Sequence, residues 1–254
     1  DSSRNSFMIK RMEDLADRTV WAMGEQLKCG DFVPFVFEHK FNMEVGDGDR
    51  KQFMSGTIDR VDICENGTDV YVRIIDYKTG KKDFNIVKTY YGIDIQLMVY
   101  MEAAMKLVAK MRPGKNVIPA GVFYYNISDP IVSATTESAE EIEDKIKGEL
   151  RLKGMVNSDK DIAEKMDNTE GTSLNIPVSR KADGGFDSRR SKVMNTEQFN
   201  MLGRFVDVRA IDTADRIVGG DIRRSPYKDG QFSSCDRCPY GAVCGFSVDL
   251  PGCN

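Results

Sequence analysis

Residues 74–82 read IIDYKTGKK, the pattern of a buried strand that ends in a cluster of charges. Two β-branched residues lead into Asp76, one spacer and Lys78, and a glycine and two lysines follow shortly after. Side chains alternate between the two faces of a strand, so Asp76 and Lys78 share one face while Tyr77 points to the other. The stretch is either an exposed charged strand end or a strand that delivers a carboxylate and an ammonium to one reactive centre.

An exposed strand end is the common interpretation of an Asp-x-Lys pattern, but three neighbouring features favour a reactive centre. Asp76 follows the apolar run VRII, which places its end of the strand near the core. The preceding segment GTIDRVD supplies Asp59 directly after an apolar residue. Gln96 and Tyr100 are four residues apart in QLMVY and lie on one face of a helix. We therefore expect these side chains to gather with Lys78 around one site.

Two carboxylates beside a lysine form a set of groups suited to Mg²⁺. This ion prefers hard oxygen ligands and usually keeps several waters and a substrate phosphate in its coordination sphere. A bound metal lowers the pKa of its water and neutralises charge that develops on a phosphoryl oxygen. Lys78 can orient that water or stabilise the negative transition state. The pattern therefore favours metal-dependent phosphodiester chemistry.

Hydrophobic periodicity predicts a mixed α/β (α+β) chain with the element order α-β-β-β-α-β. Apolar residues at helical spacing predict a first helix that stops at Gly30, and alternation predicts strands joined by turns. The expected elements are a helix over residues 6–28, strands over 32–45, 53–64 and 70–78, a helix over 93–111 and a strand over 120–128, with turns at 46–49 and 65–69.

Beyond residue 135 the pattern is weaker. It predicts a helix over 138–154, a strand over 173–178, a mobile basic loop over 181–192 and a helix over 196–220, with Thr196 as N-cap and Gly219-Gly220 as the stop. The 254 residues are 41% hydrophobic and 30% charged, without a run of about 18 apolar residues. We expect a single globular domain over 1–254, without a membrane span, internal repeat or interdomain linker.

The overall charge provides no general attraction to nucleic acid, because 36 basic and 40 acidic residues leave a net charge of −4. Any binding must come from local basic clusters. Basic residues occur around the Asp76 segment, in the 181–192 region and before the final cysteines: Lys78, Lys81, Lys82, Lys88, Arg180, Lys181, Arg189, Arg190, Lys192, Arg223 and Arg224. Tyr90, Tyr91 and Tyr100 can stack on single-stranded bases. Solvation and core packing are the alternative roles.

GTIDRVD, IIDYKTG and QLMVY, in this order, resemble the signature of PD-(D/E)xK nucleases of the RecB type, whose core has the order α-β-β-β-α-β. The resemblance implies a set of residues around one Mg²⁺ site: the metal ligands Asp59 and Asp76 with the Tyr77 backbone carbonyl, the catalytic Lys78, and Gln96 with Tyr100 on the following helix. Glu38 matches a recurrent acid of these nucleases, without an assigned role. The family's histidine precedes the first strand, whereas His39, the sole histidine here, lies within it. Either this nuclease lacks that histidine or the chain begins too late to include it; we expect the second, so that the chain is a C-terminal fragment.

Four of the six cysteines fall in the last twenty residues, an uneven distribution that favours a metal or cluster site over a disulfide framework. SSCDRCPYGAVCGF places Cys235, Cys238 and Cys244 in a C-x2-C-x5-C spacing. This spacing suits zinc or an iron–sulfur cluster, and unconnected thiols are the alternative. Cys29 and Cys64 are expected to pack as small hydrophobic residues.

The tail that follows GGDIRRSPYKDG resembles the C-terminal end of the AddB (RexB) family, helicase-like subunits of bacterial recombination helicase–nucleases. In that family these three cysteines bind a [4Fe–4S] cluster, with a fourth ligand far upstream. The resemblance implies that residues 220–254 form an iron–sulfur segment. Cys253 lies outside the family pattern.

The resemblance also implies an activity and a setting. It predicts a Mg²⁺-dependent exonuclease that degrades single-stranded DNA, the 5′-terminated strand, in double-strand-break repair. It places the protein in the bacterial cytoplasm with an AddA-like helicase–nuclease subunit as partner and without membrane contact. Two alternatives are a non-catalytic, cluster-stapled scaffold that binds DNA and a stand-alone RecB-type nuclease with a zinc-binding tail.

Overall fold

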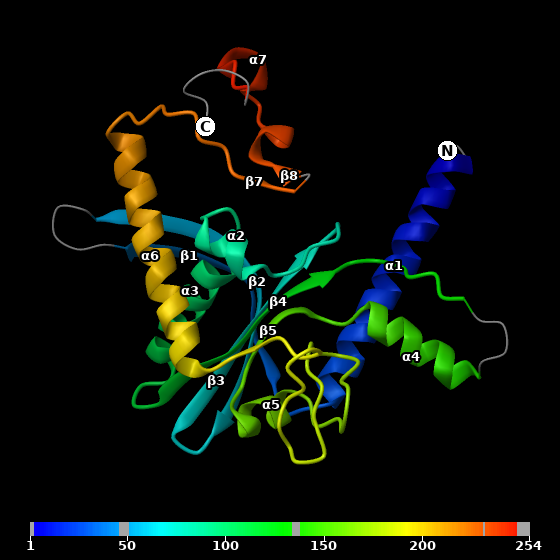
Figure 1. Cartoon of the computed structure of the whole chain (residues 1–254). Coiled ribbons are helices and arrows are strands. Elements are labelled where there is room, and N and C mark those ends of the chain that lie inside the picture. Colours follow the sequence, from blue (N-terminus) through cyan, green and yellow to red (C-terminus); the bar gives the residue numbers. More distant parts are fainter. Residues whose placement is uncertain (1–2, 46–50, 134–137, 231, 248–254) are drawn as a thin grey trace.

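The computed structural model describes residues 3–45, 51–133, 138–230 and 232–247, and it contains one six-stranded mixed sheet with helices on both faces (Figure 1). The sheet comprises β1 (Val33–Val45), β2 (Gln52–Asn66), β3 (Asp69–Lys78), β4 (Asn116–Asn126), β5 (Lys153–Asn157) and β6 (Val193–Met194). The helices around it are α1 (Ser3–Lys28), α2 (Ile86–Tyr90), α3 (Gln96–Met111), α4 (Ala139–Glu149), α5 (Lys160–Met166) and α6 (Thr196–Val218).

The strand order in space follows the order in sequence, β1 to β6. The first three strands pair antiparallel, and β4 pairs parallel with β3 because helix α3 crosses between them. The register of this parallel pair places Asp76 beside Tyr124 and Lys78 beside Asn126. The predicted α/β fold and the α-β-β-β-α-β order are therefore confirmed, with the short helix α2 added before α3.

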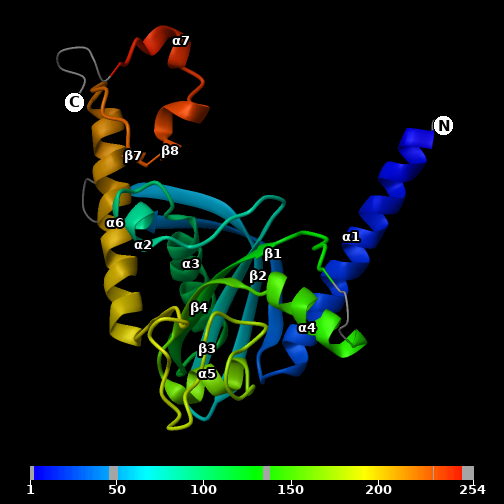
Figure 2. The ribbon, with the colours of Figure 1, turned by 45° about the vertical axis from the view of Figure 1, so that its right-hand side comes forward.

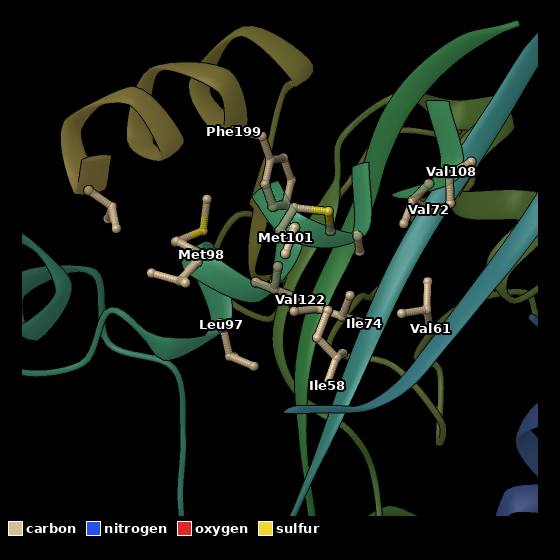
Figure 3. Close-up of a cluster of buried hydrophobic side chains, with 14 of the residues drawn as sticks. Ile58, Val61, Val72, Ile74, Leu97, Met98, Met101, Val108, Val122 and Phe199 are labelled. Atoms are coloured by element: carbon tan, nitrogen blue, oxygen red, sulfur yellow. The ribbon is translucent and has the colours of Figure 1, made fainter. Parts of the chain in front are cut away.

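Two apolar cores lie on the two faces of the sheet, as Figures 1 and 2 show from two directions. Helices α3 and α6 cover one face, where Ile74, Leu97, Val122 and Phe199 pack together (Figure 3). Residues of α1, α4 and α5 cover the other face, where Ile75 is buried. Since β3 is buried on both sides, the alternation of its side chains directs Asp76 to the α3 face.

A buried charge network lies on the face opposite α3. Arg60 Nε and Nη2 donate to the two carboxylate oxygens of Asp62 at 2.6 and 2.8 Å, and Arg73 Nε donates to Asp62 Oδ2 at 2.9 Å. All three side chains are at most 1% exposed. The Arg73 guanidinium also lies over the Phe32 ring, 4.9 Å from its centroid. The network joins β2 to β3 directly behind the strand ends that carry Asp59 and Asp76.

Two glycines allow close backbone contacts. A Cβ at Gly30 would lie 2.3 Å from the Lys165 carbonyl oxygen, so the chain can turn against α5 directly after α1, where a helix stop is predicted. A Cβ at Gly154 would lie 1.9 Å from the Val122 carbonyl oxygen, which lets β5 approach β4. Side chains at these positions would push apart the elements that frame the sheet.

The structure corrects several expectations beyond residue 135. The helix expected over 138–154 ends at Glu149, and Lys153 begins β5. Residues 173–178 form bends instead of a strand, flanked by the isolated bridge Thr172–Ser179. Ser173 Oγ accepts from the backbone N–H groups of Asn175 and Ile176, so side-chain hydrogen bonds replace a strand ladder.

Helix α6 is capped one residue earlier than expected. The N-cap is Asn195, whose side chain accepts from Gln198 N–H in a capping box, whereas Thr196 accepts from Asn157 Nδ2 at 2.8 Å. Gly219 ends the helix as expected. Periodicity did not predict α2, α5, β5 or β6, which have at most seven residues each. The turn expected at 46–49 lies outside the described residues.

The chain ends in a small segment beside α6, made of β7 (Lys228–Asp229), β8 (Phe232–Ser233), a 3₁₀ turn (Ser234–Arg237) and α7 (Gly241–Cys244) (Figures 1 and 2). No helix in the described parts of the chain is both long and apolar enough to cross a lipid bilayer.

Candidate active site

Asp76 and Lys78 meet at the end of β3, on the face that α3 covers. Lys78 Nζ lies 2.5 Å from Asp76 Oδ2, and the Asp76 side chain is only 3% exposed. The Tyr77 ring lies on the opposite face, edge-on against Tyr125 with ring centroids 5.8 Å apart. The arrangement of the three side chains follows the strand alternation predicted from IIDYKTGKK.

Gln96 and Tyr100 extend this pair into a chain of contacts. Lys78 Nζ donates to Gln96 Oε1 at 3.0 Å, and Gln96 Nε2 donates to the Tyr100 hydroxyl at 2.9 Å. The Tyr100 ring packs edge-on against Phe41 of β1 at 5.7 Å. The first turns of α3 thereby fix the orientation of the lysine ammonium against the Asp76 carboxylate.

Asp59 reaches the same strand end from β2. The antiparallel pairing of β2 and β3 ends at Arg60 and Ile75, and Asp59 Oδ2 accepts from the Tyr77 backbone N–H at 2.7 Å just beyond that point. In an antiparallel ladder the N–H and C=O of one residue point toward the same neighbouring strand. The Tyr77 carbonyl therefore faces the gap that Asp59 enters.

The carboxylate of Asp76 is electrostatically unsatisfied. Burial raises its pKa above the usual aspartate range, the negative charges of Asp59 and Asp94 raise it further, and Lys78 opposes the shift. Its Oδ2 atom is buried and, apart from the ion pair with Lys78, has no hydrogen-bond partner. An added cation beside this oxygen would relieve the cost of burying the charge.

The donors fit a magnesium ion that is completed by substrate and water. No cluster of three His, Cys, Asp or Glu side chains suited to a metal occurs within the described part of the chain. Mg²⁺ is commonly held by only one or two protein carboxylates together with waters and phosphate oxygens. Asp59 and Asp76 supply two carboxylates, and the unpartnered Asp76 Oδ2 supplies a free coordination position.

Glu38 is a strained neighbour of Asp59. The pairs Phe37–Arg60 and His39–Ile58 flank it in the β1–β2 ladder, which leaves Glu38 opposite Asp59. Its φ angle of 48° lies in the left-handed region, which is uncommon outside glycine. The side chain is exposed, and His39 lies within β1, as expected. The strained position keeps one more carboxylate at the edge of the site.

Sequence reasoning missed Asp94 and Tyr124. The Tyr124 hydroxyl donates to Asp94 Oδ1 at 2.8 Å, and Lys82 Nζ lies 3.0 Å from Asp94 Oδ2. Burial and then the Asp94 charge raise the pKa of Tyr124. The ammonium groups of Lys78 and Lys82 lie 5.6 and 5.5 Å from the Tyr124 ring centroid. The available signal was the position of Asp94 two residues before Gln96, but nothing local connects it to Tyr124.

Asn126 holds the loop that follows β3. Its Oδ1 accepts from the Lys82 backbone N–H and its Nδ2 donates to the Lys82 carbonyl, both at 3.0 Å. The side-chain amide pairs with this peptide as a neighbouring strand would. The TGKK turn is therefore held at a fixed height above β4, with Lys82 directed at Asp94.

Several residues considered for DNA contact make contacts within the protein. The Tyr90 ring stacks on Phe205 at 5.2 Å and 5°, and Tyr91 contacts Tyr227 at 5.0 Å. Arg180 donates to the carbonyl oxygens of Ala163, Asp167 and Thr169, so it closes the end of α5. The basic loop over 181–192 is tied by the ion pair of Lys192 with Asp83 at 2.6 Å.

The basic residues near the final cysteines are also engaged. Arg223 pairs with Asp221 at 2.6 Å, and Arg224 Nη1 donates to the Cys244 carbonyl at 3.0 Å. Lys88 Nζ lies over the Phe232 ring, 4.4 Å from its centroid. These contacts hold the C-terminal segment together and against α2.

The cysteines of the tail do not converge on one centre. Cys235 and Cys238 are exposed and Cys244 is partly buried, and no group of three metal-binding side chains forms among the described residues. The thiols as placed do not fit a [4Fe–4S] cluster. Cys64 is buried, as expected, whereas Cys29 is only partly buried, where its thiol donates to Glu25 O and accepts from Asn175. Cys253 lies outside the described residues.

Comparison with known proteins places these features in a family. The family model described as the PD-(D/E)XK nuclease superfamily matches residues 1–245. The B-type subunit of an ATP-dependent helicase/deoxyribonuclease from Clostridium botulinum strain Hall is 36% identical over 262 residues, covering 99% of this chain. Proteins of the same description from Thermoanaerobacter sp. strain X514 and Clostridium acetobutylicum are 34% and 35% identical, covering 99% and 100% of the chain. The chain spans only 22–23% of the length of these relatives.

Proposed function

Because the chain belongs to the PD-(D/E)XK nuclease superfamily, we propose that it hydrolyses phosphodiester bonds of single-stranded DNA with Mg²⁺ held at Asp59 and Asp76. The observation that supports this most directly is the ordered chain of contacts from Asp76 through Lys78 and Gln96 to Tyr100. A solvated strand end would leave a lysine free to rotate, whereas here a buried carboxylate and a helix side chain hold its ammonium in place.

The residues divide the work by their chemistry. Asp59, Asp76 and the Tyr77 carbonyl would hold Mg²⁺, whose chemistry there is Lewis-acid activation of water and of a phosphoryl oxygen. Lys78 presents a positive charge, oriented by Gln96, to the negative charge that develops on the phosphoryl group. Tyr100 fixes Gln96, so it is a positioning residue.

The setting follows from the relatives, which are described as B-type subunits of an ATP-dependent helicase/deoxyribonuclease. We propose that the chain acts in the bacterial cytoplasm as part of such a subunit, beside an AddA-like helicase–nuclease subunit that separates the strands. Its substrate would be the 5′-terminated strand during double-strand-break repair. The [4Fe–4S] cluster at Cys235, Cys238 and Cys244 stays a prediction from the resemblance, because the described thiols do not gather. Iron, zinc and acid-labile sulfide measured after anaerobic purification test it.

The proposal is tested by cleavage of a labelled single-stranded oligonucleotide by the full chain. We expect cleavage to need Mg²⁺, to stop in EDTA, and to fall at least about a hundredfold in Asp76→Asn and in Lys78→Met. Lys110→Met is the matched control, because Lys110 is an exposed lysine at the far end of α3. Wild-type cleavage by both Asp76→Asn and Lys78→Met would contradict the assignment.

A DNA-binding scaffold without catalysis is the second candidate. It is favoured by the ion pair that neutralises Asp76 and by the absence of a third acidic ligand in a metal cluster within the described residues. The same assay separates the two. A scaffold binds the oligonucleotide but does not cut it at any Mg²⁺ concentration.

A further inference from the structure

A basic cleft of about 470 Å³ opens beside the candidate active site. The turn after Lys78 and the end of β4 line one side of it, and residues around the start of β5 line the other. Its lining contains five cationic side chains, Lys81, Lys82, Arg151, Lys153 and Lys192, and two acidic ones, Asp83 and Glu149. The cleft therefore has a positive balance, although the whole chain carries a net charge of −4.

The sheet register connects this cleft to Asp76. Asp76 of β3 pairs with Tyr124 of β4, and Tyr124 pairs in turn with Lys153 of β5. Met155, which shares the face of Lys153, packs against the core under α3, so Lys153 lies on the same face as Asp76. Neighbouring strands are about 4.8 Å apart, which places the backbone of Lys153 roughly 10 Å from that of Asp76.

Much of the positive charge in the cleft has no protein counter-ion. Asp83 pairs with Lys192 at 2.6 Å, and Asp94 pairs with Lys82 at 3.0 Å. In the described chain no carboxylate oxygen lies within 4.0 Å of the charged nitrogens of Lys81, Arg151 or Lys153. The Arg151 Nε atom is buried without a hydrogen-bond partner. These groups are arranged for an anion that the protein itself does not supply.

Burial and cation crowding act together on Lys153. Burial lowers the pKa of its ammonium, and the nearby Arg151 lowers it further, against the opposing effect of Asp83 and Glu149. A bound anion would relieve both causes. The wall opposite is rigid, because Asn126 holds both backbone polar groups of Lys82. The cleft is thus preformed, which reduces the entropy cost of binding.

We propose that this cleft binds a backbone phosphate of the same nucleic-acid strand that occupies the candidate active site, next to the phosphate that is cut. The proposal deepens the proposed function and rests on it. Arg151 presents planar donors suited to phosphate oxygens, and Lys153 and Lys81 add point charges. The cleft contacts only the backbone, so it would hold the strand without regard to base sequence and would set how far the strand extends past the cut.

Binding of a fluorescent single-stranded oligonucleotide to the full chain in EDTA, over a series of NaCl concentrations, tests the proposal without cleavage. We expect the double variant Arg151→Gln, Lys153→Met to bind about tenfold more weakly and to lose about one unit of the slope of log K against log [salt]. Lys110→Met, away from the cleft, should bind like the wild type. Lys81→Met carries the test if the double variant does not fold, because Lys81 is exposed.

A second measurement identifies the phosphate. Oligonucleotides with one neutral methylphosphonate at successive linkages should weaken wild-type binding most at one linkage near the cut, and that loss should disappear in the double variant. Equal losses in both proteins, or an unchanged salt slope in the variant, would overturn the proposal. The two hypotheses fail separately: wild-type cleavage by Asp76→Asn refutes the nuclease site, and wild-type binding by the Lys153 variant refutes the cleft.

Discussion

Replacing Asp62 by alanine tests the buried charge network behind the candidate active site. Asp62 is the single acid between the guanidinium groups of Arg60 and Arg73, and it accepts three hydrogen bonds of 2.6 to 2.9 Å from them. Its side chain is 0% exposed, as is that of Arg60. The substitution therefore leaves two buried cations unpaired.

The structure sets the size of the expected effect. Removing one partner of a buried ion pair costs about 3–5 kcal/mol, because the remaining charge stays desolvated. For a domain of this size each kcal/mol lowers the melting temperature by about 2–4 °C, so we expect a decrease of roughly 6 to 20 °C. The strand ends that carry Asp59 and Asp76 should lose their order in the same transition.

Thermal unfolding followed by circular dichroism provides the measurement, and β2 itself provides the control. Glu65 forms an ion pair of 2.7 Å with Arg112, but the two side chains are 43% and 32% exposed. Glu65→Ala should therefore cost no more than about 1 kcal/mol. Replacing Arg60, Asp62 and Arg73 together by Met, Leu and Met should recover most of the stability. If Asp62→Ala melts like Glu65→Ala, the reasoning about uncompensated burial is wrong.

Three further predictions concern pH, the loop after β3 and the close approach of β5. Burial and then the Asp207 charge raise the pKa of Glu102, so its stabilising protonated form is complete below the unfolded pKa of about 4.3 and is lost as pH rises through the folded value; Glu102→Gln should melt higher than wild type at pH 7, with the gap closing toward pH 4, and equal melting at all pH values would refute this. Asn126→Ala should free the Lys82 loop and lower kcat/KM for oligonucleotide cleavage about tenfold without changing the fold, as activity assays and circular dichroism can check. Gly154→Ala should cost about 1–3 kcal/mol in urea unfolding, because its Cβ would meet the Val122 carbonyl oxygen; an unchanged midpoint would show that β5 yields without cost.

The fold and the centre of the site were predictable because their signals are local. Alternation over IIDYK places Asp76 and Lys78 on one face, and the four-residue spacing of Gln96 and Tyr100 places both on one side of α3. Less regular segments gave weaker predictions. Ser173 and Asn195 use side-chain hydrogen bonds in place of periodic backbone structure, so the predicted strand was wrong and the N-cap shifted by one residue.

What the sequence by itself determined is the set of elements and the identity of the face that carries the reactive groups, since both follow from periods of two and about four residues. Only the tertiary structure decided which distant side chains complete that face. Tyr124 reaches Asp76 through the parallel register of β3 and β4, and Lys153 joins through β5. Such registers depend on how α3 and α6 pack over the sheet, and no local pattern in the chain encodes that packing.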